Sequence, residues 1–310
     1  TYVRLLEMAK YYVFVNLISL FSSSLLILYL LIFLDMGIVS MVFGEILRAL
    51  MLSVACFPVW FKKARFSLSF SILKEPLAFG YPQILSGYSN LLFQSGDRYL
   101  LQLFMSASSV GLYSFGYKIA SIINFLIVGP LKQALAPFVL KEEKNPLQQK
   151  EFLKKSANHY YLFALSLWLF LSIFSAEIVR MVASNDSFWG SWVIIPIIGF
   201  SYVQHGLGNF VGWGVSMANK GHIISANIFF AALINMVLNF FFIPVWGILG
   251  AAAATLISYI VWNGLKMYFS AKFYNLHFDL RSLAISTLIA VLVLYFGISF
   301  AGSELWYINI

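Results

Sequence analysis

The chain has 310 residues, of which 61% are hydrophobic and only 10% are charged, and its formal net charge is +8. A soluble globular domain contains about 25% charged residues, so this composition excludes a soluble enzyme or binding domain and predicts an integral membrane protein. The basic residues stand in short clusters between apolar runs, which is typical of membrane topology and does not indicate nucleic-acid binding.

Nine stretches are long and apolar enough to cross a bilayer, since a helical span needs about 20 residues. They cover residues 11–34, 37–61, 78–104, 110–136, 157–176, 191–214, 222–243, 247–269 and 283–301. The one sizeable polar connector, residues 141–155, is expected to be a cytoplasmic loop. We therefore predict an all-α membrane protein, a polytopic bundle of about nine transmembrane helices.

The basic residues alternate between connectors. They stand before the first span and after spans two, four, six and eight, whereas the other connectors contain a single basic residue, Arg180. Because positively charged loops stay in the cytoplasm, the pattern predicts that Thr1 lies on the cytoplasmic side.

The first two spans share a pattern with the seventh and eighth. Each pair has an asparagine near its start, Asn16 or Asn227, and a tight outer turn that ends in Gly-Ile at Gly37 or Gly247. Internal repeats are common in transporters. If the halves match, about 130 residues and four helices are expected before Thr1; a chance likeness of two apolar hairpins is the alternative.

The third span carries a polar stripe on one helical face, within about 80° of arc. Its members are Gln83, Ser86, Asn90, Gln94 and Asp97, and it ends in the charged pair Asp97 and Arg98. Polar groups at this depth must face protein or water, because hydrocarbon leaves their hydrogen bonds unmade. Two interpretations stay open: hydrogen bonds between packed helices, or the lining of a water-filled cavity.

After a short break at Ser106–Ser109, the fourth span presents a second polar face. It comprises Tyr113, Tyr117, Ser121 and Asn124, with Lys118 at its margin.

Charged residues inside spans are functional candidates, because their burial in a bilayer is costly. Glu45 and Arg48 share one face of the second span and could instead form a structural pair, and Asp97 and Arg98 could snorkel to the interface. Together Arg48, Arg98 and Lys118 would make the outer half of a cavity cationic, which suits an anionic ligand such as a diphosphate.

Packing between helices is an alternative role for the other polar residues. The face of the seventh span formed by Asn227, Asn235 and Asn239 is expected to join helices. His205 lies in a glycine-rich part of the sixth span, where we expect a bend, and it is either a proton relay or a packing histidine. The sequence has no metal-spaced His/Cys cluster, catalytic triad or phosphate loop. We therefore predict no catalytic residues, no metal and no cofactor.

Two segments resemble the polysaccharide biosynthesis flippases of the multidrug/oligosaccharidyl-lipid/polysaccharide exporter superfamily. They are GDRYLL at Gly96–Leu101 and VGLYSFGYKIA at Val110–Ala120, and the turn at Trp246–Ala252 is similar to that family's closing hairpin. The resemblance implies two six-helix lobes around a central cavity. It assigns residues 1–75 to the last two helices of the first lobe with a cytoplasmic connector, 76–275 to the second lobe and 276–310 to an additional helix.

The resemblance implies a flippase, not an enzyme. Its substrate would be an undecaprenyl-diphosphate-linked oligosaccharide, moved across the bacterial inner membrane for lipopolysaccharide O-antigen, capsule or exopolysaccharide assembly. The bilayer and polysaccharide polymerase or assembly proteins would be its other partners. The cavity candidates are Arg48, Gln83, Asn90, Gln94, Asp97, Arg98, Tyr117, Lys118 and Asn124. Glu45, Asp97 and His205 are the candidates for ion coupling.

Three rival functions stay open. A cation-coupled drug antiporter of the same superfamily would need an anionic cavity. A membrane-embedded polymerase or acyltransferase usually carries a large external loop or a catalytic His/Asp motif, which this chain lacks. A structural scaffold for the assembly machinery would not need charged stripes on several helices.

Overall fold

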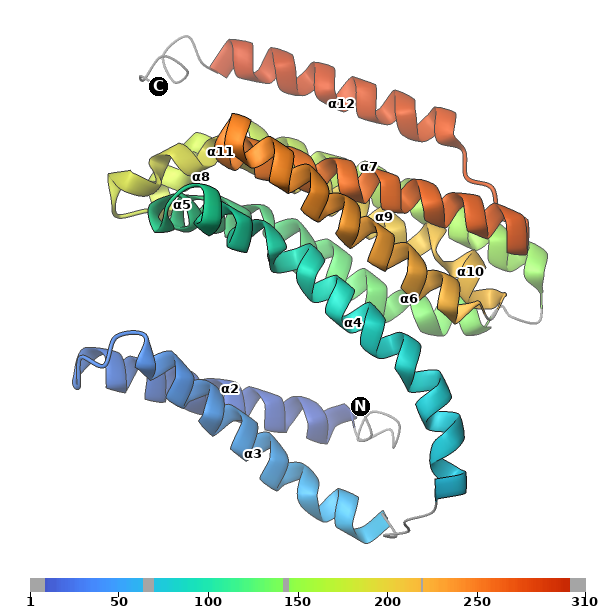
Figure 1. Cartoon of the computed structure of the whole chain (residues 1–310), viewed down its shortest axis with the longest axis horizontal. Helices are drawn as coiled ribbons and strands as arrows, with labels where there is room; N and C mark the ends of the chain where they lie inside the picture. The colour runs from blue at the N-terminus through green and yellow to red at the C-terminus, as the bar shows by residue number, and fades with distance from the viewer. Residues whose placement is uncertain (1–8, 64–69, 142–144, 219, 302–310) are drawn as a thin grey trace. The chain divides into compact units, whose positions relative to one another are not determined.

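A computed structural model describes residues 9–63, 70–141, 145–218 and 220–301, and nearly all of these residues are helical, with no strand among them (Figure 1). The chain divides into two compact units, Thr1–Lys74 and Glu75–Ile310. We describe each unit by itself. The assignment of these parts to two lobes stays a prediction.

The first unit is an antiparallel pair of helices, α2 (Ala9–Ile32) and α3 (Val39–Lys63). The turn between them passes through Gly37, whose φ of 52° suits glycine because it has no side chain to clash. The Ser40 hydroxyl donates to the Gly37 carbonyl at 2.6 Å. A Cβ at Gly44 would lie 2.2 Å from Ile27 Cγ1, so this glycine lets the two helices approach closely.

The second unit is formed by the remaining helices, of which α4 begins shortly before the boundary. They are α4 (Phe70–Phe104), α5 (Ala107–Ala120), the π-helical turn η1 (Asn124–Val128), α6 (Gly129–Lys141), α7 (Pro146–Ile173), α8 (Ser175–Val182), the 3-10 segment η3 (Asp186–Ile194), α9 (Ile195–Val211), α10 (Trp213–Met217), α11 (Gly221–Tyr274) and α12 (Leu280–Ala301).

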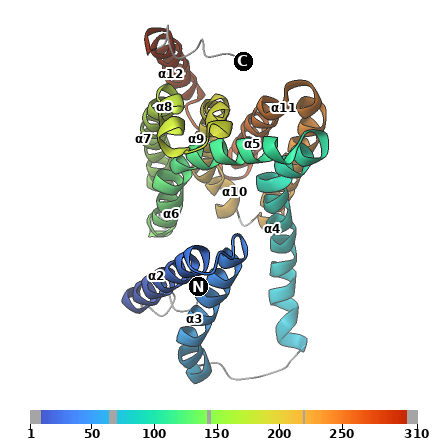
Figure 2. The same cartoon turned by 90° about the vertical axis from the view of Figure 1, so that its left-hand side faces the viewer.

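Helix α9 lies at the centre of the second unit, in contact with α5, α7 and α11. Figure 2 shows it between α7 and α11. Its neighbours donate hydrogen bonds to its carbonyl groups: Tyr160 to Val203 at 2.9 Å and Trp168 to Pro196 at 2.7 Å. The central helix is therefore held by hydrogen bonds as well as by apolar packing.

Helix α11 is a hairpin of two arms. A straight helix of its 54 residues would be about 80 Å long, far longer than a bilayer is thick. Gly247 breaks it with a non-helical φ of 55° and ψ of −131°. The two arms then lie side by side, and the Asn235 amide donates to Thr255 Oγ1 at 3.5 Å. This turn stands where the sequence predicts one, and its φ is close to that of Gly37.

Four helical segments among the described residues are long and apolar enough to cross a membrane, and a fifth if the pair α7 and α8, bent by 66°, forms one span. The four are Val13–Ile32, Ala107–Leu135, Gly221–Tyr274 and Leu280–Ser299. Since Gly221–Tyr274 is broken at Gly247, it provides two of the nine predicted spans. The other predicted crossings coincide with helices and stay predictions.

Two local expectations need correction. The connector 141–155 is not a loop through most of its length, because α7 begins at Pro146, with the Asn145 side chain accepting a hydrogen bond from the Gln148 N–H at 3.4 Å. The expected bend near His205 is absent, since α9 stays helical from Ile195 to Val211. The interruption follows at Gly212, where α9 gives way to α10.

We predict that replacing Gly247 by valine destabilises the protein by about 1–3 kcal/mol, because a β-branched side chain is strained at this φ and ψ. The built Cβ would also lie 3.1 Å from Met105 Cε. The measurement is the thermal unfolding of the full-length protein in detergent. Gly264→Val on the same helix is the control, since a Cβ there meets no atom within 4 Å. Equal unfolding temperatures for the two variants would contradict the prediction.

Candidate functional site

Asp97 is enclosed by protein at the end of α4. Its side chain is 1% exposed. Its Oδ2 accepts a hydrogen bond from the Tyr113 hydroxyl on α5 at 2.6 Å, and its Oδ1 accepts one from the Arg98 N–H at 2.8 Å. The snorkelling alternative is therefore wrong for this carboxylate, which joins two helices.

The neighbouring guanidinium group of Arg98 is fixed by several contacts. Arg98 Nη1 donates to the Gln94 carbonyl at 2.7 Å and lies 3.5 Å from Asp97 Oδ1. Its Nε donates to the Ser114 hydroxyl at 3.3 Å, and its Cζ lies 4.5 Å from the centre of the Tyr117 ring. A guanidinium placed over an aromatic face gains cation–π attraction. These contacts hold the Arg98 side chain in one position.

A cavity of about 410 Å³ opens beside this guanidinium, and we call it the Arg98 cavity. Its lining includes Arg98, Ser114, Tyr117, Lys118, Ser121 and Tyr202. No carboxylate is among the described residues that line it. Cations, hydroxyl groups and aromatic rings are groups that bind phosphates and sugars.

The polar stripe of α4 divides between the two open interpretations. Ser86 donates a hydrogen bond to Ser225 on α11 at 2.7 Å, so this part joins helices, as Asp97 does. Asn90 and Gln94 are exposed, and the Gln94 amide donates to Asn90 Oδ1 at 2.9 Å. Of the stripe residues whose side chains the structure describes, Asn90 alone lines one of the two cavities described in this section. The side chain of Gln83 lies outside the described residues.

The remaining site candidates differ in their surroundings. Tyr117 is buried beneath Arg98, whereas Lys118 is exposed at the cavity. Asn124 begins the π-helical turn, where its carbonyl accepts a hydrogen bond from the Gly129 N–H, and it lines neither cavity described in this section.

Glu45 and Arg48 form a pair within the first unit. Arg48 Nη1 lies 3.8 Å from Glu45 Oε1, and the two side chains are 36% and 70% exposed respectively. This pairing agrees with the structural alternative. Arg48 is thus engaged with its neighbour on α3, and its predicted place in a substrate cavity stays untested.

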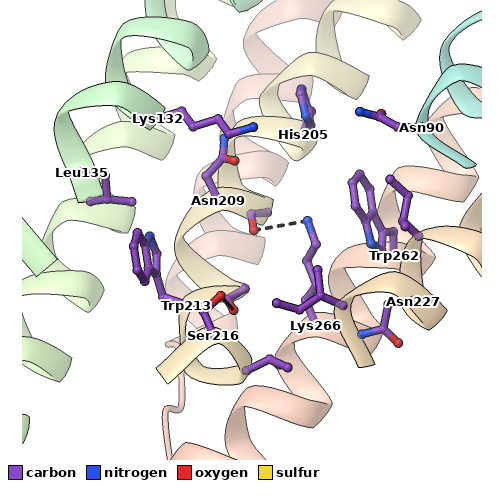
Figure 3. Close-up of a pocket in the computed structure, with 15 residues that line it drawn as sticks. Asn90, Lys132, Leu135, His205, Asn209, Trp213, Ser216, Asn227, Trp262 and Lys266 are labelled. Atoms are coloured by element: carbon purple, nitrogen blue, oxygen red, sulfur yellow. Dashed lines mark hydrogen bonds between the residues drawn. The ribbon is translucent and has the colours of Figure 1, made fainter. Parts of the chain in front are cut away.

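A second cavity of about 400 Å³ lies where α4, α6, α9, α10 and α11 meet (Figure 3), and we call it the Lys266 cavity. Its polar lining includes Asn90, Lys132, His205, Asn209, Asn227 and Lys266. Lys132 from α6 and Lys266 from α11 extend into the same space beside α9 (Figure 3). No carboxylate is among its described lining residues.

His205 faces this cavity from α9. Its ring is stacked on Trp262 at 16° and lies 5.3 Å from the Tyr259 ring. Its Nδ1 is buried without a hydrogen-bond partner among the described residues. The ring faces of His205 pack against aromatic neighbours, as the packing interpretation predicts. That interpretation does not account for the unpaired Nδ1 atom.

The asparagines of α11 also separate into two groups. Asn235 and Asn239 are fully buried: Asn239 donates to Asn235 Oδ1 at 3.0 Å within one arm, and Asn235 donates to Thr255 Oγ1 at 3.5 Å on the other arm, so Asn235 joins the two arms as expected. Asn227 instead lines the Lys266 cavity.

Sequence reasoning missed Lys132, Asn209 and Lys266. The rule that singled out Lys118, that charges inside spans are functional candidates, applies equally to the two lysines and could have found them. Asn209 had no comparable signal, since its neighbours become known only when α9 and α6 are placed together.

Three comparisons bear on this arrangement. A family model described as "Polysaccharide biosynthesis protein" matches residues 6–192. The probable low-salt glycan biosynthesis flippase Agl15 of Haloferax volcanii is 24% identical over 217 residues, 68% of this chain and 46% of that protein. The chain thus spans about half the length of the curated relative that it matches.

Among solved structures, the inward closed conformation of the lipid II flippase MurJ matches with a TM-score of 0.70. The likeness covers 88% of this chain and 59% of that one, at 15% sequence identity. At this identity it establishes the fold.

We predict that Tyr113→Phe destabilises the protein by about 2 kcal/mol, because it removes a hydrogen bond from a buried carboxylate. Thermal unfolding of the full-length protein in detergent measures the effect. Tyr99→Phe is the matched control, since the Tyr99 side chain on α4 is 76% exposed. The prediction fails if the two variants unfold at the same temperature.

Proposed function

Because the chain belongs to the polysaccharide biosynthesis protein family, we propose that it acts within a flippase for lipid-linked saccharides. The family model spans both segments that carry the sequence resemblance, which is thereby confirmed. The predicted all-α, multi-pass membrane fold is also confirmed by the likeness to MurJ. The activity rests on this membership and on the named flippases to which the chain is similar.

The Arg98 cavity is the observation that carries the proposal. Its two cations are suited to a diphosphate, and its hydroxyl groups and aromatic rings are suited to the adjoining sugar. Arg98 is held in place by Gln94, Ser114 and Tyr117, so it can offer a fixed donor. Lys118 is exposed and has no ion-pair partner within the described ranges, so its ammonium is available to a ligand.

The charge of the cavities favours a flippase of anionic lipids over a drug antiporter. The Arg98 and Lys266 cavities are lined by four cations, Arg98, Lys118, Lys132 and Lys266, and by no carboxylate from the described part of the chain. A pump for cationic drugs needs the opposite sign of charge. The relatives are named flippases, which also disfavours a polymerase or an acyltransferase.

The same proposal includes the carrier lipid, the membrane and the fate of the product. The carrier would be undecaprenyl diphosphate, the membrane would be the bacterial inner membrane with Thr1 in the cytoplasm, and the product would feed O-antigen, capsule or exopolysaccharide assembly. Polysaccharide polymerase and assembly proteins would act with it. Ion coupling through Glu45, Asp97 or His205 stays a prediction.

We predict that Lys118→Gln lowers flipping at least about tenfold, because one charge-assisted hydrogen bond to a phosphate contributes about 1.5–3 kcal/mol. The measurement is translocation of a fluorescent lipid-linked oligosaccharide by the full-length protein in proteoliposomes. Lys118→Arg should retain activity, since it keeps the positive charge.

Lys154→Gln is the matched control, because Lys154 is exposed on α7 and lines neither cavity. Unchanged translocation by a well-folded Lys118→Gln protein would rule out this role for the Arg98 cavity.

A further inference from the structure

We propose that the Lys266 cavity is a second binding site, specific for a phosphate group. It shares no lining residue with the Arg98 cavity, which carries the proposed function, so the inference goes beyond that function.

Three residues that line the cavity carry donors without acceptors. They are Asn209, Asn227 and Trp262, whose Nδ2, Nδ2 and Nε1 atoms are buried and have no hydrogen-bond partner among the described residues. Asn227 and Trp262 are only 4% and 8% exposed. A buried donor left unpaired costs about 1–3 kcal/mol, so three around one cavity indicate a ligand rich in acceptor atoms.

The cavity also contains a cation without a counter-ion. Lys266 Nζ donates to the Gly208 carbonyl at 3.3 Å and lies 3.5 Å from the centre of the Trp262 ring. No carboxylate within 4.0 Å of this ammonium is found in the described ranges. Burying an ammonium without a partner is costly, and an anion in the cavity would compensate that charge.

A glycine of α9 leaves space for the Lys266 side chain. A Cβ at Gly208 would lie 2.7 Å from Lys266 Nζ, and one at Gly212 would lie 3.7 Å from Lys266 Cδ. A Cβ at Gly208 would clash with the ammonium, whereas one at Gly212 would make ordinary van der Waals contact with the Lys266 side chain, so the missing side chain at Gly208 leaves room for Lys266 Nζ beside the cavity. This glycine-rich segment therefore makes room for the Lys266 cation and does not interrupt the helix.

The cavity has room and access for a phosphate. Its volume of about 400 Å³ far exceeds the roughly 30 Å³ that one water occupies in the liquid. Its rim residues Asn90, Lys132 and Ile224 are exposed. Lys132 adds a second cation at this entrance.

The position in the unit also fits an anion from the cytoplasmic side. Lys266 follows Gly247 by 19 residues along the second arm of α11, which is about 28 Å at 1.5 Å per residue. It therefore lies toward the end that carries Lys220 and the basic connectors, which the topology predicts to be cytoplasmic. The phosphate could be borne by a lipid or be free in solution, and both share the same chemistry.

The test measures phosphate binding to the full-length protein in nanodiscs, with two probes. Radiolabelled inorganic phosphate is titrated onto protein in phosphatidylcholine nanodiscs. In the second experiment, the protein is placed in nanodiscs that contain phosphatidylcholine and phosphatidic acid. Native mass spectrometry then measures how much phosphatidic acid stays bound to the protein. Saturable binding of the inorganic ion assigns a free phosphate, and retention of phosphatidic acid alone assigns a lipid-borne one.

We expect Lys266→Gln to weaken binding at least tenfold, whereas Lys266→Arg retains it. Lys272→Gln is the matched control on the same helix, since Lys272 is exposed and lies outside the cavity. Asn227→Asp should also abolish binding, because it replaces an amide donor by a negatively charged carboxylate of nearly the same size. It keeps the proposal testable if Lys266→Gln does not fold.

Lys118→Gln should leave this binding unchanged, because Lys118 lines the other cavity. The proposal is overturned if neither probe binds, or if binding survives in the folded Lys266→Gln and Asn227→Asp proteins. A loss in Lys118→Gln with no loss in Lys266→Gln would assign the phosphate to the Arg98 cavity and would equally overturn it.

Discussion

Hydrocarbon offers no partner for a hydrogen bond, so every polar group within a membrane-spanning bundle must find one inside the protein, in water or in a ligand. In the second unit, side chains of α7 and α11 meet this requirement by donating to carbonyl groups of α9. Tyr160 reaches Val203, Trp168 reaches Pro196, and Asn263 reaches Gln204 at 2.7 Å. Around Lys266, three buried donors lack a partner among the described residues, and a cavity lies beside them.

The two cavities differ in how their cations are held. Arg98 is fixed by a carboxylate, a carbonyl, a hydroxyl group and an aromatic ring, and only Lys118 beside it is unrestrained. Lys266 is held by one carbonyl and one indole ring. Each cavity thus keeps a lysine with no carboxylate partner in the described part of the chain, Lys118 in one and Lys266 in the other.

Much of the helical layout could be predicted from the sequence, because apolar length and turn residues are local properties. The hairpin at Gly247 is read directly from the chain, whereas the break predicted at Ser106–Ser109 is confined to Met105 and Ser106, because Ser106 is the N-cap of α5, which begins at Ala107. The partners of polar residues are not local. Ser86 finds Ser225 and Asp97 finds Tyr113 only once helices are placed against each other. The stripe on α4 therefore looked uniform in sequence, although its members have different roles.

The glycines of α9 show the same limit. Gly206 and Gly208 suggested a bend, yet both lie in a continuous helix. A Cβ at Gly206 would lie 1.8 Å from the Tyr160 hydroxyl oxygen, so its small size serves a neighbour's side chain. A glycine in a helix can provide flexibility or space, and the sequence alone does not distinguish the two uses.

The lack of a side chain at Gly208 leaves the room that the Lys266 ammonium occupies. A single methyl group there would keep the helix intact, since alanine is the best helix former, and yet it would occupy the place of the Lys266 ammonium, 2.7 Å away. The lysine would have to swing out, and the hollow beside it would lose its positive charge without any change in a charged residue. A substitution at this glycine would therefore change the charge that the cavity presents to a ligand. Comparisons of related proteins should examine this glycine together with the lysines.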